Sequence, residues 1–161
     1  MTFNEVKDTL RLYATHQQHP TQVNEAHAAL ADCGDQVING LIWALGQDDI
    51  DLKLLGLQLL QEHFHDAERA LPAVRALILD CDDRLIRVTA MNTLHIVGDM
   101  CEDRIPLLTP RLASEDDFER LGAAANLWRI CRSEDVYVVL RRKAARKESP
   151  MAEMAQGYLE G

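Results

Sequence analysis

The sequence predicts an all-α, right-handed solenoid of about five antiparallel helix pairs with a period of 34 residues. Paired aspartates stand at 48–49, 82–83 and 116–117, and Pro72 and Pro106 are separated by the same interval. A fixed period in this range is typical of helix pairs that stack so that each covers the apolar face of its neighbour. Hydrophobic residues make up 47% of the chain and aromatic residues 5%, which fits a helical core of aliphatic side chains.

The chain is interpreted as one domain, 1–161, with a capping pair at each end. Its units are the N-terminal pair 1–34, three repeats over 35–131, and the C-terminal pair 132–161. Helices are expected in the terminal pairs at 4–16, 22–33, 135–147 and 150–160. A loop around His19-Pro20 joins the first two helices, Gly34 serves as a helix C-cap, and the last helix begins at Ser149-Pro150.

Each repeat reads as a short apolar helix, an acidic turn and a second helix. The first helices and their turns lie at 37–49, 71–83 and 105–117, and the second helices at 50–64, 84–97 and 118–131. The turn aspartates can accept hydrogen bonds from the free N–H groups of the second helix and face its positive dipole end. Spacings of four place a small rank (Gly56, Ala90, Ala124) between the ranks Leu52, Ile86, Arg120 and Leu60, Leu94, Trp128. A small middle rank favours close helix–helix approach.

The middle repeat resembles a HEAT repeat. The residues that carry the resemblance are Leu71-Pro72, Leu77, Asp80, Asp83, Ile86-Arg87, Ala90 and Leu94. The family's unit has a proline in its first helix, an aspartate between the helices, then a Val-Arg step and spaced Ala and Leu in the second helix. In the neighbouring repeats Leu52-Lys53 replaces the hydrophobe–Arg step, and Arg120 comes before Leu121, outside the expected place.

The resemblance covers about residues 35–147 and implies a HEAT-like fold. Proteins of that family are mostly scaffolds, adaptors and transport factors. A few are enzymes that use the groove for substrates, among them bilin lyase-like proteins and a class of alkylpurine DNA glycosylases. The resemblance therefore implies a binding surface without naming what it binds, because one fold hosts many functions.

A stripe of polar side chains is the candidate binding site. Gln58, Asn92 and Asn126 share one position of the second helix in three successive repeats, and Gln61, His95 and Arg129 follow three residues later. The resemblance implies that second helices line the concave side, so these six would cross the groove. Side-chain amides can pair with the backbone of an extended peptide, as the asparagine ladders of similar armadillo repeats do. The alternative is that any solenoid needs polar residues at its solvated positions.

A basic run near the C-terminus is the second candidate surface. It comprises Arg141, Arg142, Lys143, Arg146 and Lys147, and such a run can dock an acidic protein, RNA or an anionic membrane. The alternative is that the helix dipole favours basic residues in the last turns of a helix. The run has no interleaved aromatic residue to stack a base. Trp43 and Trp128 are interpreted as packing residues.

The sequence predicts no catalytic, metal or cofactor site. His63 and His65 are two apart on a helix and point about 200° apart, so they do not converge on a metal. The four cysteines are too widely spaced for a zinc ribbon or a CxxC redox site. The chain also lacks GxSxG, P-loop, HExxH and dinucleotide fingerprints.

The charge balance argues against a general nucleic-acid binder. The formal net charge is −9 and the pI is near 5.0, whereas nucleic-acid binding needs a basic face that displaces counterions. No 18-residue apolar run is present to span a bilayer. The N-terminus has no basic segment followed by an apolar one, as a secretory signal would. A cytoplasmic protein that does not bind membranes is therefore expected.

These observations predict a non-catalytic scaffold or adaptor that holds another protein or an extended peptide on its concave face. A narrower alternative is an acidic inhibitor, such as an immunity-type protein, that blocks a basic toxin or enzyme. The competing class is a small groove enzyme or ligand carrier of the bilin lyase-like HEAT type. The protein is expected to be a monomer, with end-to-end self-association through an open end of the stack as a further possibility.

Overall fold

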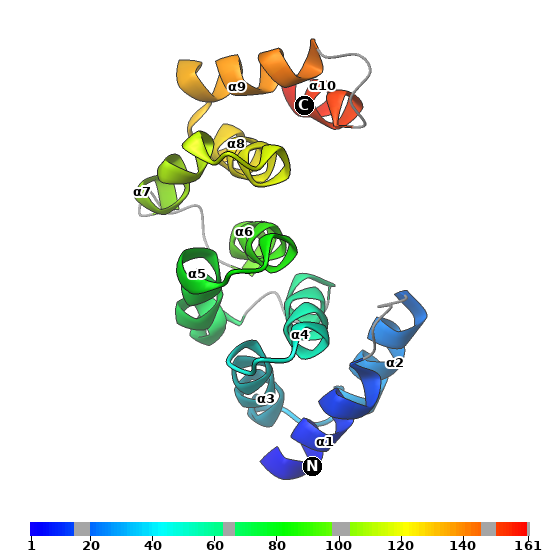
Figure 1. The fold of residues 1–161 in the computed structure, drawn as a ribbon. Helices are drawn as coiled ribbons and strands as arrows, with labels where there is room; N and C mark the ends of the chain where they lie inside the picture. The colour runs from blue at the N-terminus through cyan, green and yellow to red at the C-terminus, as the bar shows by residue number, and fades with distance from the viewer. Residues whose placement is uncertain (15–19, 63–66, 98–103, 146–150, 161) are drawn as a thin grey trace.

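The computed structural model of the protein describes residues 1–14, 20–62, 67–97, 104–145 and 151–160. Within these ranges it contains ten α-helices, two short 3₁₀ segments and no β-strand. Figure 1 shows the helices stacked as successive pairs from the N-terminus to the C-terminus. The prediction of an all-α fold with paired helices is confirmed.

The helices begin and end close to the predicted positions. Their bounds are α1 Phe3–Tyr13, α2 Pro20–Leu30, α3 Asp35–Leu45, α4 Ile50–Glu62, α5 Leu71–Asp80, α6 Arg84–Val97, α7 Arg104–Leu108, α8 Asp117–Cys131, α9 Glu134–Ala144 and α10 Ala152–Glu160. The 3₁₀ segments are η1 Glu68–Ala70 and η2 Thr109–Ala113. The predicted starts of the second helices, residues 50, 84 and 118, agree with the structure to within one residue.

Two local predictions were wrong. Gly34 does not cap the end of α2, because α2 ends at Leu30 and Gly34 is the N-cap of α3, where its φ of 52° suits a residue without a Cβ. The first helix of the third repeat is not continuous either. It is divided into α7 and η2 because Pro110 supplies no N–H to continue the α-helical bonding. His19 and Ser149-Pro150 lie outside the described residues.

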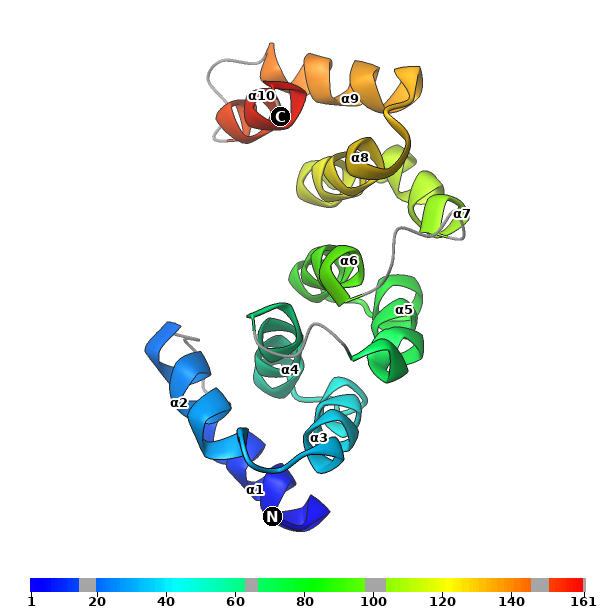
Figure 2. The ribbon, with the colours of Figure 1, turned by 180° about the vertical axis from the view of Figure 1, so that it is seen from behind.

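The repeats are arranged in two layers. Helix α4 packs on α6 and α6 on α8, while α3 packs on α5. Figures 1 and 2 show that the stack curves, with α4, α6 and α8 on the inner side of the curve, towards which α2 and α10 project. We call the surface of α4, α6 and α8 on this side the inner face.

The predicted small rank lies in the core and allows the layers to approach. Gly56 is buried, and Ala90 and Ala124 are fully buried. A Cβ on Gly56 would lie 3.2 Å from Leu45 Cδ2 and 3.6 Å from Ala44 Cβ. Helix α4 therefore lies close to the last turn of α3, and a Cβ at position 56 would require the Leu45 side chain to shift by a few tenths of an ångström.

The turn aspartates cap the second helices, with a shift of one residue in the third repeat. The Oδ1 atoms of Asp49 and Asp83 accept bonds from the second and third N–H groups that follow them, at 2.8–3.1 Å. In the third repeat this role falls to Asp116, whose Oδ1 accepts from the N–H groups of Phe118 (2.9 Å) and Glu119 (2.8 Å). Asp117, which the 34-residue period aligns with Asp49 and Asp83, is left for other contacts.

A buried ion network joins the second repeat to the third. The Glu119 carboxylate is 3% exposed and accepts bonds from Arg87 Nε (2.9 Å) and Arg87 Nη2 (3.0 Å). Arg111 Nη1 (3.2 Å) and Ser114 Oγ (2.9 Å) donate to the same carboxylate. Arg111 also donates to the carbonyl of Ile78 at the end of α5 (2.7 Å). Burial, the largest single influence, opposes ionisation of Glu119. The hydrogen bonds from Arg87 and Ser114 and the positive charges of Arg87 and Arg111 together outweigh it, so the pKa of Glu119 is lowered.

Candidate protein-binding face

All six residues of the predicted polar stripe lie on second helices. The stripe consists of Gln58 and Gln61 on α4, Asn92 and His95 on α6, and Asn126 and Arg129 on α8. Asn126 is buried and Arg129 is exposed, whereas the other four are half-buried. The stripe therefore extends across three successive repeats but is unevenly open to a partner.

The amides of Asn92 and Asn126 meet across neighbouring helices. Asn126 Nδ2 donates to Asn92 Oδ1 (3.0 Å) and to the Gly122 carbonyl (2.9 Å). A Cβ on Gly122 would lie 3.0 Å from Val88 Cγ1, so glycine allows α8 to lie close to α6. Asn126 is only 1% exposed, and both N–H donors of its side chain are used in these two hydrogen bonds within the protein. Its effect on a partner would therefore pass through Asn92, whose Oδ1 it holds.

A threonine that sequence reasoning missed fixes Gln61. Gln61 Nε2 donates to Thr93 Oγ1 (2.7 Å) and to the Thr89 carbonyl (3.3 Å), and Thr93 Oγ1 donates to the same carbonyl (2.9 Å). Thr93 is fully buried. The signal in the sequence was a hydroxyl beside an apolar rank, which becomes informative only when α4 is placed against α6.

The inner face contains buried polar atoms whose hydrogen-bonding capacity is unused. Among the described residues, Gln58 Oε1, His95 Nδ1 and Asn126 Oδ1 are buried without a hydrogen-bond partner. Burial, followed by the positive charges of Arg129 and Arg104, lowers the pKa of His95. His95 is therefore a neutral imidazole at pH 7, with one donor and one acceptor nitrogen.

At the C-terminal end of the stripe the surface is hollow and lined by aromatic and cationic groups. A hollow of about 440 Å³ is lined by Trp128, Arg129, Arg132, Met154, Gly157 and Tyr158; we call it the C-terminal hollow. A smaller one of about 60 Å³ lies between α6, α8 and α10 and includes Asn92, Gly122 and Tyr158. Sequence reasoning missed Arg132, Met154 and Tyr158, because only the fold brings α10 against α8.

Comparison with known protein families identifies the type of repeat. A family model described as HEAT repeats matches residues 38–128, which is more than half of the chain. The chain belongs to the HEAT repeat family. No curated protein matches the sequence. HEAT repeats are generally protein-interaction scaffolds and are usually non-catalytic, so the family supports a binding role without specifying it.

The capping shift explains the early position of the third HEAT-repeat arginine. Counted from the capping aspartate, Arg120 stands four residues on, as Lys53 and Arg87 do in their repeats. Arg87 Nη1 donates to the carbonyl six residues before it, that of Cys81 (2.7 Å), and Arg120 Nη1 donates to the equivalent carbonyl of Ser114. The basic position of the repeat is therefore kept, contrary to what the fixed 34-residue spacing predicts.

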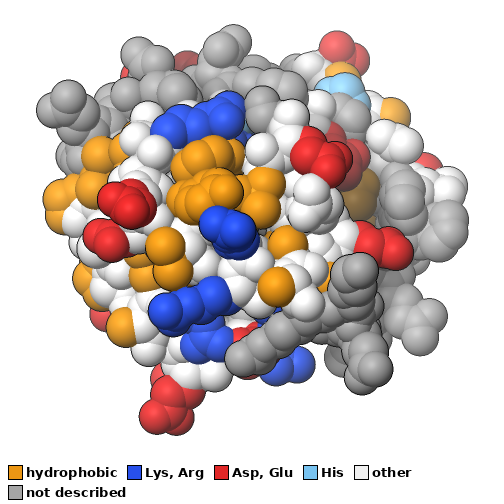
Figure 3. Space-filling view, turned by 90° about the horizontal axis from the view of Figure 1, so that it is seen from above, with side chains coloured by type: hydrophobic (Ala, Val, Ile, Leu, Met, Phe, Trp, Pro, Cys, Tyr) orange, Lys and Arg blue, Asp and Glu red, His pale blue; other side chains and the backbone are white. Residues whose placement is uncertain are grey.

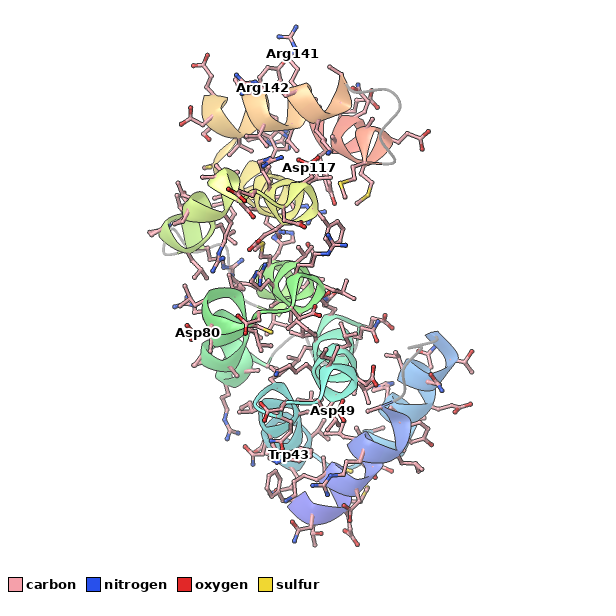
Figure 4. The ribbon with its side chains drawn as sticks, in the orientation of Figure 1. Trp43, Asp49, Asp80, Asp117, Arg141 and Arg142 are labelled. Atoms are coloured by element: carbon pink, nitrogen blue, oxygen red, sulfur yellow. The ribbon has the colours of Figure 1, made fainter. Side chains whose placement is uncertain are left out.

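The basic run does not form one continuous patch in the described residues. Arg141 and Arg142 are exposed, and Figure 4 shows Arg141 pointing away from the stack. Lys143 instead bonds Asp117, which also pairs with Arg120. Figure 3 looks onto this end of the molecule and shows apolar side chains with Lys and Arg side chains around them. Arg146 and Lys147 lie outside the described residues.

The remaining functional predictions concern metal ions and membranes. In the part of the chain that the structure describes, no three His, Cys, Asp or Glu side chains gather as metal ligands would. His63 and His65 lie outside those residues. None of the helices described is both long and apolar enough to span a bilayer.

Helix α9 exposes Tyr137 (38%) and Val138 (37%) at the end of the stack, and self-association through that end stays a prediction.

Proposed function

We propose that this chain is a non-catalytic HEAT-repeat module that binds an extended segment of another protein on its inner face. The observation that carries the proposal is the set of polar groups that three successive second helices bring together there. Their hydrogen-bonding capacity is only partly used within the protein. The membership in the HEAT repeat family, whose members are generally interaction scaffolds, supports it.

Asn92 is the centre of the proposed site. Its Oδ1 accepts the bond from Asn126, which orients the amide and leaves the two N–H groups of Asn92 for a carbonyl of the partner. Neighbouring packed helices lie about 8–10 Å apart, and an extended chain advances about 3.3 Å per residue. About every third residue of a bound segment would therefore meet the stripe, which suits recognition of backbone groups rather than of every side chain.

The chemistry of the stripe supports binding rather than catalysis. His95 is the one imidazole of the stripe, and the charges that act on it come from Arg129 and Arg104. A general base or a nucleophile pair would instead place a carboxylate or a hydroxyl beside the imidazole. Amide and imidazole groups at these positions can exchange hydrogen bonds with a peptide without further activation.

A displayed library of random 16-residue peptides tests the proposal. Peptides enriched on the wild-type protein are synthesised with a fluorescent label, and their Kd is measured by anisotropy. Asn92→Asp keeps an acceptor for Asn126 but removes the two donors, so it is expected to raise Kd by about 5-fold or more, the equivalent of one hydrogen bond. Asn4→Asp makes the same chemical change on the exposed face of α1 and is expected to leave Kd unchanged.

Two results would contradict the proposal. One is a library that enriches no peptide above an unrelated control protein. The other is a set of peptides that bind both variants as tightly as the wild type. Circular dichroism melts of both variants establish that a lost interaction does not reflect a lost fold.

The acidic edge supports a second candidate function. Asp48, Asp82 and Glu115 are exposed at the turns of three successive repeats, on the edge where the capping aspartates lie. An edge of this kind suits an inhibitor that blocks a basic protein. In that case the library would enrich Lys- and Arg-rich peptides, whose binding would fall when Asp48 and Asp82 are changed to asparagine and would be indifferent to Asn92→Asp.

A further inference from the structure

Helix α9 lies at the C-terminal end of the stack and turns one side to solvent. It packs on α8 and α10, and Figure 1 shows it as the last layer of the stack. Val136 and Leu140 on its inner side are buried. Its solvent side carries a set of exposed residues, which we call the outer stripe: Glu134, Asp135, Val138, Arg141 and Arg142. Because spacings of three, four and seven bring residues to the same side of a helix, the outer stripe forms one surface.

The charges of the outer stripe change sign along the helix. Glu134 and Asp135 lie in the first turn of α9, and Arg141 and Arg142 lie in its last turn. In the described part of the chain none of these four side chains forms an ion pair. The helix dipole favours this order of charges, but it does not account for an exposed apolar residue, Val138 (37%), at their centre.

Val138 is the midpoint of the outer stripe, and the stripe is therefore complementary to itself. Glu134 comes four residues before Val138, and Arg142 comes four residues after it. Asp135 and Arg141 are each three residues away. When two such helices pack antiparallel with their Val138 residues in contact, each residue before the midpoint faces the residue equally far after it. Glu134 then meets Arg142 of the second copy, and Asp135 meets Arg141 of the second copy. Two-fold symmetry repeats both ion pairs on the other side of the apolar centre.

The side chains around the midpoint allow such a contact. Tyr137, beside the stripe, is 38% exposed and packs on Trp128 with 6.0 Å between the ring centres, so it enlarges the apolar centre. The Arg141 guanidinium lies 6.0 Å from the Tyr137 ring, a contact that leaves its N–H groups for a carboxylate. Figure 4 shows the Arg141 side chain pointing away from the stack, where a second copy would meet it.

The C-terminal end of the molecule is also the end where two copies repel each other least. Residues 1–103 contain 7 Lys and Arg against 17 Asp and Glu, whereas residues 104–161 contain 10 against 9. The excess negative charge of the chain therefore lies away from α9. Exposed charges more than about 8 Å apart are largely screened at physiological ionic strength, so the pairs within the contact outweigh the charge of the distant repeats.

We propose that two copies of this chain associate through an antiparallel contact between their α9 helices, with Val138 on the two-fold axis and the acidic turn of each outer stripe against the basic turn of the other. The contact uses no residue of the polar stripe, so it is independent of the proposed function, and it gives the assembly two inner faces. One pair of short helices buries less than the about 1,200 Å² of a stable interface. A reversible dimer with a Kd on the order of 10–100 μM is therefore expected.

Sedimentation velocity of the full chain from about 5 to about 500 μM tests the proposal. The wild type is expected to shift from monomer to dimer, and to do so less readily in about 500 mM than in about 50 mM NaCl, because salt screens exposed ion pairs. Arg141→Glu and Asp135→Arg each replace an attraction by a repulsion at two symmetric places, so each is expected to raise Kd by about tenfold or more. A wild type that stays monomeric at every concentration would overturn the proposal.

A mixture of these two variants tests the pairing itself. In a pair of one Arg141→Glu chain and one Asp135→Arg chain, every charge of the outer stripe again faces an opposite charge. The mixture is therefore expected to form a 1:1 dimer about as tightly as the wild type, although each variant alone dimerises weakly. Each substitution changes the net charge of −9 by only two units, so both variants stay acidic and attraction between whole molecules cannot produce this result. Variants that remain monomeric when mixed would overturn the pairing.

Asp8→Arg is the matched control, because it reverses an aspartate whose side chain is 74% exposed on α1, at the other end of the stack. It is expected to leave the dimer Kd within about twofold. If the basic turn of α9 instead met the acidic α1 of another copy, Asp8→Arg would weaken the association and the mixture would not restore it, which would overturn the two-fold pairing. Circular dichroism melts establish that each variant is folded. Should Asp135→Arg lose its fold, Glu134→Arg mixed with Arg142→Glu tests the other ion pair by the same criterion.

Discussion

Replacing Glu119 with alanine is expected to destabilise the protein more than any single surface change, because two arginines lose their common counter-ion. The carboxylate is 3% exposed, and the side chains of Arg87 and Arg111 are 16% and 25% exposed. Removing one partner of a buried ion pair costs about 3–5 kcal/mol. Because both arginines keep some contact with water, the lower end of that range, about 3 kcal/mol, applies here.

Urea and thermal unfolding, both followed by circular dichroism, measure this effect. For a chain of this size a loss of about 3 kcal/mol corresponds to a fall in Tm of roughly 6–12 °C. Asp8→Ala is the matched control, because it breaks the exposed Arg11–Asp8 pair, whose side chains are 54% and 74% exposed. That control should change the free energy of unfolding by less than about 0.5 kcal/mol.

Glu119 also connects two repeats, which changes the shape of the transition. In a solenoid the total stability is close to a sum of repeat and interface contributions. Weakening the contact between Glu119 and Arg87 should let residues beyond α6 unfold before the others, and a single transition should broaden or split. A loss no larger than that of Asp8→Ala, below about 0.5 kcal/mol, would refute the assignment of Glu119 as a desolvated anion.

Two further effects follow from the structure. Burial and the charges of Arg129 and Arg104 lower the pKa of His95. The contribution of His95 to stability is therefore present above about pH 6.5 and is lost as the pH falls through the lowered folded-state pKa. Between pH 7.5 and pH 5 the urea midpoint should fall less in His95→Gln than in the wild type. A Cβ on Gly40 would lie 2.4 Å from the Cγ1 atom of the buried Val6, so Gly40→Ala should lower the free energy of unfolding by about 1–3 kcal/mol. Adding Val6→Ala should restore part of it, and a Gly40→Ala melt unchanged from the wild type would contradict the close contact.

Much of the fold could be predicted because each repeat has its own acidic turn and its own apolar ranks. The acidic turns precede α4, α6 and α8, and the apolar ranks of these helices repeat every four residues, so the second helices were located to within one residue at their starts. The division of the first helix of the third repeat into α7 and η2 was not predicted, because Pro110 is not part of the 34-residue period that relates Pro72 to Pro106. Gly34 was misplaced because a glycine between two helices can end one or begin the next, and only its φ of 52° decides.

Less of the candidate site could be predicted, because periodicity places residues on a face without showing what covers them. The stripe was placed on the second helices, yet the burial of Asn126 depends on its packing between neighbouring elements and on its bond to Asn92. Thr93 became part of the site only through its contact with Gln61, 32 residues away. The C-terminal hollow depends on α10, whose sequence lies outside the regular repeats and carries no periodic signal.

The sequence period and the structure make opposite predictions about Asp116 and Asp117. The 34-residue period aligns Asp117 with the caps Asp49 and Asp83, and therefore predicts that Asp117→Ala would be the costlier change. In the structure Asp116 accepts the two N–H bonds at the start of α8 and also pairs with Arg84 at 2.8 Å. The lowered pKa of Asp116 agrees with this, because the backbone bond from Glu119 and the bond from Arg84 favour its ionised form.

The structure therefore reverses the expected order of the two variants. Loss of an N-cap costs about 1–2 kcal/mol, whereas Asp117, with 40% of its side chain exposed, forms ion pairs with Arg120 and Lys143 that contribute less than about 1 kcal/mol. Asp116→Ala should lower the urea midpoint more than Asp117→Ala, and Asp116→Asn, which keeps a capping oxygen, should recover most of the loss. If Asp117→Ala were the more damaging change, α8 would begin where the 34-residue period places it. The one-residue shift of the cap would then be wrong, and Arg120 would not be equivalent to Arg87.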